Sequence, residues 1–101
     1  MLKGGEKMLM KREMIEMFFS FENAAVASGH LDVKTKELIA IACSIMADCL
    51  PCLEHHYKMA AQNGVTVDEA KEAIAVAVAI SAGNKIGKFS IKAAELFKET
   101  V

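Results

Sequence analysis

The sequence contains no tryptophan, one proline and only three cysteines in 101 residues, and its net charge is -1. A charge this close to zero, with both signs interspersed, does not provide the basic footprint that nucleic-acid binding requires. Three cysteines cannot form the disulfide framework of a small secreted domain. The most apolar run, Ala73 to Ala82, is about half as long as a membrane-spanning helix. The start, Met1 to Lys7, lacks the apolar segment of a signal peptide, so we expect a cytoplasmic protein with no nucleic-acid or membrane partner.

Apolar residues, in contrast, are abundant, because they make up 53% of the chain. A small domain has a large surface relative to its volume and can bury only part of such a content by itself. We therefore expect a homo-oligomer.

Apolar residues recur at three- and four-residue steps, and this predicts an all-α protein of about five helices in a single domain over residues 1–101. We expect residues 1–7 to be flexible. The first helix is expected from about Glu6 to Ser28. A second begins at the N-cap Asp32 and runs to about Ala47, and a third is capped by Asp48 and ends at Asn63-Gly64.

The C-terminal part is expected to form two further helices. Thr66 and Glu69 fit a capping box, which predicts a fourth helix over Asp68–Ser81. Gly83-Asn84 interrupts the pattern before a last helix, Lys85–Glu99. The fourth helix is apolar on all sides, so it should be either the central helix of the subunit or part of an oligomer interface.

The chemistry-bearing motif is Cys49-Leu50-Pro51-Cys52 at the start of the third helix. Cys49, Cys52 and His56 share one helix face, because they are three and four residues apart. Unpaired N–H groups and the helix dipole at a helix start favour thiolate, the reactive form of cysteine. A nearby imidazole can accept and return the proton. These parts predict attack of one thiolate on a peroxide or a disulfide, resolution by the second cysteine, and resetting by an external dithiol reductant.

Two structural interpretations compete with this redox hypothesis. Cys49 and Cys52 with His55 or His56 could bind zinc in a non-catalytic assembly module, although a closed site needs a fourth ligand. The cysteines could also be ordinary buried side chains. For Cys43 we favour that interpretation, because it lies on the apolar face of the second helix.

The segment Leu31 to Leu38 followed by Cys49 to His56 resembles the carboxymuconolactone decarboxylase superfamily. Within it, the match is to the alkylhydroperoxidase D-like branch, whose pattern is a Glu, eleven residues, C-x-x-C, three residues and a His. Glu37, Cys49, Cys52 and His56 fit that spacing.

The resemblance implies an all-helical trimer or hexamer that reduces peroxides or disulfides, with Cys49 and Cys52 as the reacting pair. We expect no cofactor or metal. The resemblance also implies a proton relay through Glu37 and His56; from spacing alone, Glu37 reads as a surface charge. Pro51 occupies a position where family members often carry an aromatic residue or histidine. An alternative function within the superfamily is decarboxylation of a lactone acid, but the decarboxylases lack this dithiol.

Overall fold

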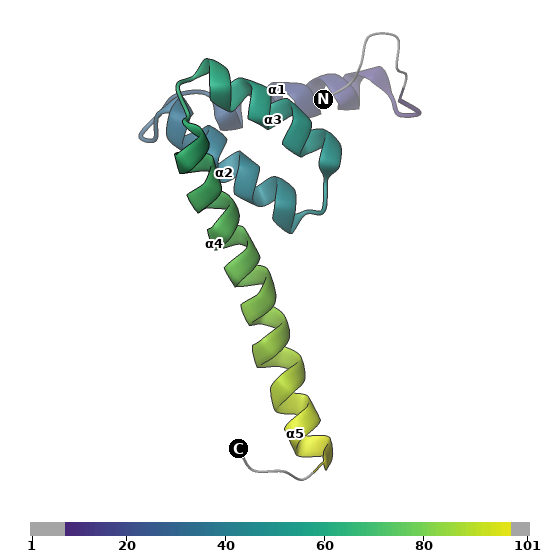
Figure 1. Cartoon of the computed structure of the whole chain (residues 1–101). Helices are drawn as coiled ribbons and strands as arrows, with labels where there is room; N and C mark the ends of the chain where they lie inside the picture. The colour runs from purple at the N-terminus through teal and green to yellow at the C-terminus, as the bar shows by residue number, and fades with distance from the viewer. Residues whose placement is uncertain (1–7, 98–101) are drawn as a thin grey trace.

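The computed structural model describes residues 8–97, and all regular secondary structure in that range is helical (Figure 1). The expectations for residues 1–7 and for residues 98 and 99 of the last helix lie outside the described residues. The elements are α1 (Arg12–Val26), α2 (Val33–Met46), α3 (Leu50–Gln62), α4 (Val67–Lys85), a π-helical segment η1 (Ile86–Ser90) and α5 (Ile91–Phe97). The prediction of an all-α fold is confirmed.

Local capping explains where α2 and α4 begin. The N–H of Thr35 donates to Oδ1 of Asp32 at 2.8 Å. Hydrogen bonding from the side chain and then from the backbone of Thr35 lowers the pKa of Asp32. Ahead of α4, the Glu69 N–H donates to Oγ1 of Thr66 at 3.1 Å, while the Thr66 N–H donates to Oε1 of Glu69 at 2.8 Å. Both predicted caps are therefore confirmed. Gly64 follows α3 with φ of 84°, a left-handed conformation that suits glycine.

The turn between α2 and α3 differs from the prediction. Asp48 does not cap α3; it lies in the turn with φ of 53°, and Cys49 is the N-cap. The Cys49 N–H donates to the carbonyl oxygen of Ser44 at 2.9 Å, which closes this turn. Aspartate tolerates the left-handed region better than most residues, so the tight turn is formed without glycine.

The predicted break at Gly83-Asn84 is wrong. These residues continue α4, which passes through η1 into α5 without an intervening loop, so the described chain has four helical rods instead of about five. Glycine weakens a helix interior by about 1 kcal/mol but ends the helix only where the backbone turns left-handed, and Gly83 does not adopt a positive φ. We refer to the continuous rod Val67–Phe97 as the arm.

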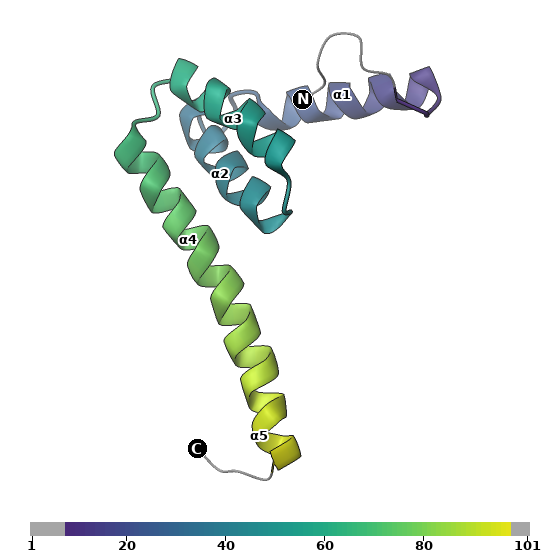
Figure 2. The same cartoon turned by 45° about the vertical axis from the view of Figure 1, so that its right-hand side comes forward.

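Within residues 8–97 the buried apolar core is small and consists of Ile41, Ala60 and Ala77. α2 packs against α3 and the first part of α4, whereas α1 makes few contacts, and those are with α2. Figure 2 shows the arm extending away from the α2–α3 pair, with α1 projecting to another side. The radius of gyration is 18.2 Å, whereas about 13 Å is typical of a compact domain of this length.

The arm is largely uncovered. Val76 and Ile80 are 60% and 59% exposed, and Ala77 is the buried residue of α4. The prediction that this helix is the central helix of the subunit is therefore wrong for the single chain, and the alternative, an oligomer interface, stays a prediction. By length and composition alone the arm could cross a membrane. That is weak evidence, because an apolar helix covered by other protein passes the same test.

Candidate active site

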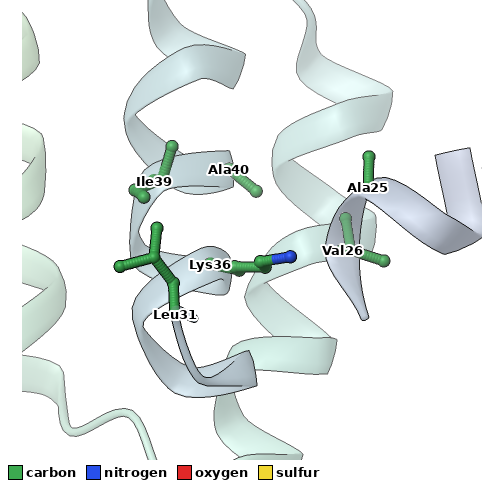
Figure 3. Close-up of a pocket in the computed structure, with 6 residues that line it drawn as sticks. All are labelled: Ala25, Val26, Leu31, Lys36, Ile39 and Ala40. Atoms are coloured by element: carbon green, nitrogen blue, oxygen red, sulfur yellow. The ribbon is translucent and has the colours of Figure 1, made fainter. Parts of the chain in front are cut away.

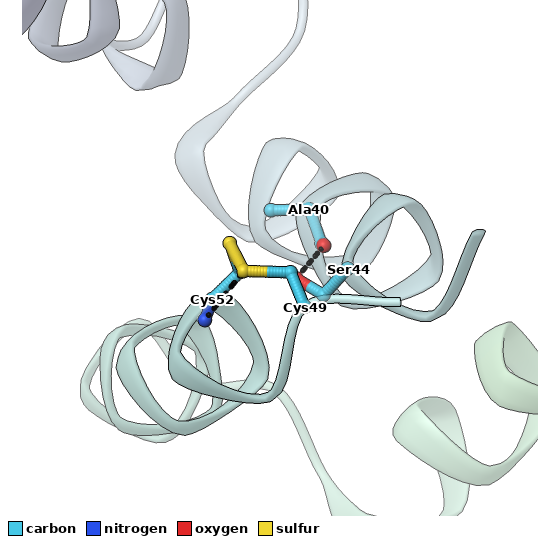
Figure 4. The surroundings of a disulfide bond; sticks show 4 residues. All are labelled: Ala40, Ser44, Cys49 and Cys52. Carbon is cyan, nitrogen blue, oxygen red and sulfur yellow. Dashed lines mark hydrogen bonds between the residues drawn. A yellow bond between two sulfur atoms is a disulfide. The ribbon is translucent and has the colours of Figure 1, made fainter. Parts of the chain in front are cut away.

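Cys49 and Cys52 are joined by a disulfide at the first turn of α3 (Figure 4). The Cys52 N–H donates to Sγ of Cys49 at 3.2 Å, so the sulfur of Cys49 occupies the role of a side-chain N-cap. Pro51 lies in the first helical turn, where a backbone N–H has no partner within the helix. The sequence thus places both sulfurs at the positive end of the helix dipole, which favours a thiolate once the pair is reduced.

Glu37 of α2 and His56 of α3 form the second part of the site. Nδ1 of His56 and Oε2 of Glu37 are hydrogen-bonded at 2.8 Å. The Glu37 side chain is 1% exposed and that of His56 is 12% exposed. A carboxylate this deeply buried requires a partner, and the imidazole provides it. Because Nδ1 is engaged by Glu37, Nε2 is the ring nitrogen left for proton exchange.

A pocket of about 220 Å³ lies where α1, α2 and α3 meet. Its lining consists of Glu22, Ala40, Cys43, Ser44, Ala47, Cys52 and His56. Cys52 and His56 therefore face one shared space, which we call the dithiol pocket. Cys49 and Glu37 are not part of the lining, and Glu37 is connected to the pocket through its hydrogen bond with His56. Ser44 is buried and its Oγ donates to the carbonyl oxygen of Ala40 at 2.7 Å.

Two residues of this lining depart from the sequence interpretation. Cys43 was expected in the core, but it is exposed and borders the dithiol pocket. The physical reason is that α1 covers little of the apolar face of α2. Glu22 was not identified at all. Its position depends on where α1 meets α2, and no local motif in the sequence encodes that geometry.

His55 lies beside the site without lining it. Its ring meets that of His56 edge-on, with 4.9 Å between the centroids. Partial burial is the main cause that lowers the pKa of His55, and the nearby charges of Glu37 and Glu22 act in the opposite direction. Within residues 8–97, no three His, Cys, Asp or Glu side chains are grouped as a metal site requires. This arrangement does not support the alternative in which Cys49, Cys52 and His55 bind zinc.

A second, apolar pocket of about 260 Å³ adjoins the first along α2 (Figure 3). It is lined by Ala25, Val26, Leu31, Lys36, Ile39 and Ala40. Ala40 borders both pockets, so they follow the same side of α2. The one charged group here, Lys36 Nζ, donates a hydrogen bond to the carbonyl oxygen of Ala27.

Comparison with known proteins places the chain in a family. The model of the carboxymuconolactone decarboxylase family matches residues 12–95, and the chain belongs to this family. A crystal structure from Methanobacterium thermoautotrophicum superposes with a TM-score of 0.73 at 36% identity, covering 80% of this chain and 93% of the other. A Thermotoga maritima structure gives a TM-score of 0.65 at 27% identity, covering 88% and 98%. The Thermotoga protein is described as a member of the same family with a suggested involvement in antioxidative response.

A curated relative from Paracoccus denitrificans, uncharacterized protein 4 in the cox locus, is 38% identical over 68 residues. These residues are 67% of this chain and 61% of the relative. The chain thus spans less than two thirds of the length of that relative.

Proposed function

We propose that this protein is a dithiol oxidoreductase that reduces hydroperoxides or disulfides through Cys49 and Cys52. The observation that carries the proposal is the pairing of these cysteines at a helix start, with Cys52 and His56 lining one pocket. Family membership and the antioxidative role suggested for the Thermotoga protein support the same chemistry.

Cys52 is the attacking thiol in this mechanism, because it borders the pocket and Cys49 does not. The Cys52 thiolate attacks one peroxide oxygen, forming an S–O bond and breaking the O–O bond. The departing alkoxide takes a proton from His56 and leaves as an alcohol. With a disulfide substrate, the same thiolate forms a mixed disulfide and displaces the other sulfur as a thiol.

Cys49 completes the half-reaction. Its sulfur attacks Cys52, which forms the Cys49–Cys52 disulfide and releases water from the sulfenic acid or the second thiol from the mixed disulfide. The enzyme has then lost two electrons to the substrate. An external dithiol restores them and becomes a disulfide itself, so no bound metal or cofactor is needed.

Glu37 supports His56 in both steps. Its hydrogen bond to Nδ1 fixes the ring and compensates the positive charge that develops when Nε2 accepts the Cys52 proton. The role parallels that of the buried carboxylate in a catalytic triad, where the acid orients the imidazole without reacting. Glu37 is accordingly a positioning residue in this proposal.

Cysteine variants test the function directly. With dithiothreitol as reductant, we expect Cys49→Ser and Cys52→Ser each to lose multiple-turnover hydroperoxide reduction. Cys43→Ser removes the third thiol but leaves the pair intact, and it should retain turnover. Cys49→Ser should still consume one equivalent of peroxide and accumulate a sulfenic acid at residue 52, visible by mass spectrometry after trapping with dimedone. Full turnover by both Cys49→Ser and Cys52→Ser would refute the proposal.

The alternative lactone decarboxylase activity requires a pocket that attracts a carboxylate. The dithiol pocket contains no lysine or arginine in its lining, whereas Glu22 is present. A lactone acid would therefore meet a like charge at this site.

We further propose that the protein works in the cytoplasm as a homo-oligomer, a trimer or hexamer. A reducing compartment would supply the external dithiol. Assembly would cover the exposed apolar side chains of the arm and of α1, among them Met17, Phe21 and Val76. Light scattering at the working concentration measures the subunit number.

A further inference from the structure

The feature without a role in the proposed chemistry is Glu22. This residue is half-buried in α1 and borders the dithiol pocket, whereas the reacting groups Cys52 and His56 come from α3. Its charge also influences His55, which lies next to His56 on α3. Glu22 and Cys52 therefore line the same pocket.

Among the described residues that line this pocket, Glu22 carries the only carboxylate. The lining includes no lysine or arginine. Glu37 is shielded, since it is 1% exposed and bonded to His56. Lys36, in the adjoining pocket, is held by the carbonyl oxygen of Ala27 and does not line the dithiol pocket.

The adjoining pocket along α2 is lined by apolar side chains and Lys36, so the two pockets together combine a largely apolar section with the carboxylate of Glu22. An uncharged organic molecule can occupy both sections without electrostatic cost. A molecule that carries a carboxylate near its reacting group meets repulsion from Glu22, and in the reduced enzyme this adds to repulsion from the thiolate.

We propose that Glu22 is a specificity-determining residue, which makes the dithiol pocket select uncharged organic hydroperoxides or disulfides and reject anionic ones. This inference rests on the proposed dithiol chemistry and adds a substrate class to it. Glu22 acts by charge on substrate binding and takes no part in bond making or proton transfer.

The test compares two forms of one substrate, a short-chain hydroperoxide bearing a carboxylate and its methyl ester, at pH 8 with dithiothreitol. Wild-type protein should reduce the ester with the higher kcat/KM. Glu22→Gln should raise kcat/KM for the acid by roughly threefold to tenfold, as expected for two like unit charges about 6 Å apart in largely aqueous surroundings. The gain should appear as a lower KM, and kcat/KM for the ester should not change.

Glu16→Gln is the matched control, because it removes the same charge from the exposed side of α1 away from the pocket. It should leave the acid-to-ester ratio unchanged. A variant-independent measurement uses salt: raising ionic strength should speed wild-type reduction of the acid but not of the ester, because salt screens partly exposed charges.

The outcomes separate this inference from the proposed function. If the ester is reduced in a Cys52-dependent reaction, but neither Glu22→Gln nor salt changes the ratio of kcat/KM for the acid to kcat/KM for the ester, the inference is overturned. The proposed function would still stand. Absence of Cys52-dependent reduction of either form, and of a neutral disulfide, would overturn both.

Discussion

The change His56→Ala removes the ring nitrogen that lies 2.8 Å from Oε2 of Glu37. The Glu37 side chain is 1% exposed, so water cannot readily replace the lost partner. Leaving a buried acceptor without its hydrogen-bond partner costs about 1–3 kcal/mol, and more when the acceptor is charged. Small domains unfold with a free energy of about 5–15 kcal/mol, so this variant should lose a large part of its stability.

Urea unfolding followed by far-UV circular dichroism measures the effect, at one fixed protein concentration because assembly would shift apparent stability. The double variant Glu37→Leu/His56→Ala removes the buried charge together with its partner and should recover at least about 2 kcal/mol at pH 8. The reasoning is refuted if His56→Ala costs less than about 1 kcal/mol at every pH, or if the double variant is no more stable than His56→Ala.

Three further predictions concern other residues. Burial lowers the pKa of His55, so the unfolded chain takes up its proton first and stability should fall as pH drops below about 6.5; His55→Gln should flatten this part of a stability-versus-pH curve. Cys43 is exposed while Cys49 and Cys52 are bonded, so maleimide should label one thiol per chain in oxidised protein and three after reduction, with peptide mapping by mass spectrometry as the readout. Gly64 has φ of 84° and no atom within 4 Å of an added Cβ, whereas Gly83 is helical with equally free space; Gly64→Ala should therefore destabilise by about 1 kcal/mol and Gly83→Ala stabilise by a similar amount in urea unfolding. Destabilisation by Gly83→Ala would show that another subunit occupies the space that is free around Gly83 within one chain.

Local signals in the sequence were sufficient for the starts of α2 and α4 and for the order of the reactive residues. Asp32 and Thr66 act through contacts three residues away, and the Cys49–Cys52 pairing is equally local. The pairing of Glu37 with His56 spans 19 residues and two helices. Periodicity alone could not predict it, and the expectation came from a family resemblance.

The features that the sequence could not indicate depend on how the helices pack against one another. Cys43 has the pattern of a core residue and becomes exposed because α1 covers little of α2. Glu22 reaches the dithiol pocket for the same tertiary reason. Gly83 and Asn84 are residues that often end a helix, but here the apolar residues on both sides continue one helix. In each case the local preference was weak and tertiary geometry determined the outcome.

The N-cap position of Cys49 bears on the reduction potential of the dithiol. In the oxidised protein its neutral sulfur accepts the Cys52 N–H, whereas in the reduced protein a thiolate there would also face the positive end of α3. Interactions that are stronger with the thiolate stabilise the reduced state, and each 1.4 kcal/mol of this preference raises the potential of a two-electron couple by about 30 mV. The start of α3 thus biases the pair toward accepting electrons, so a mild dithiol would suffice to regenerate it after each turnover.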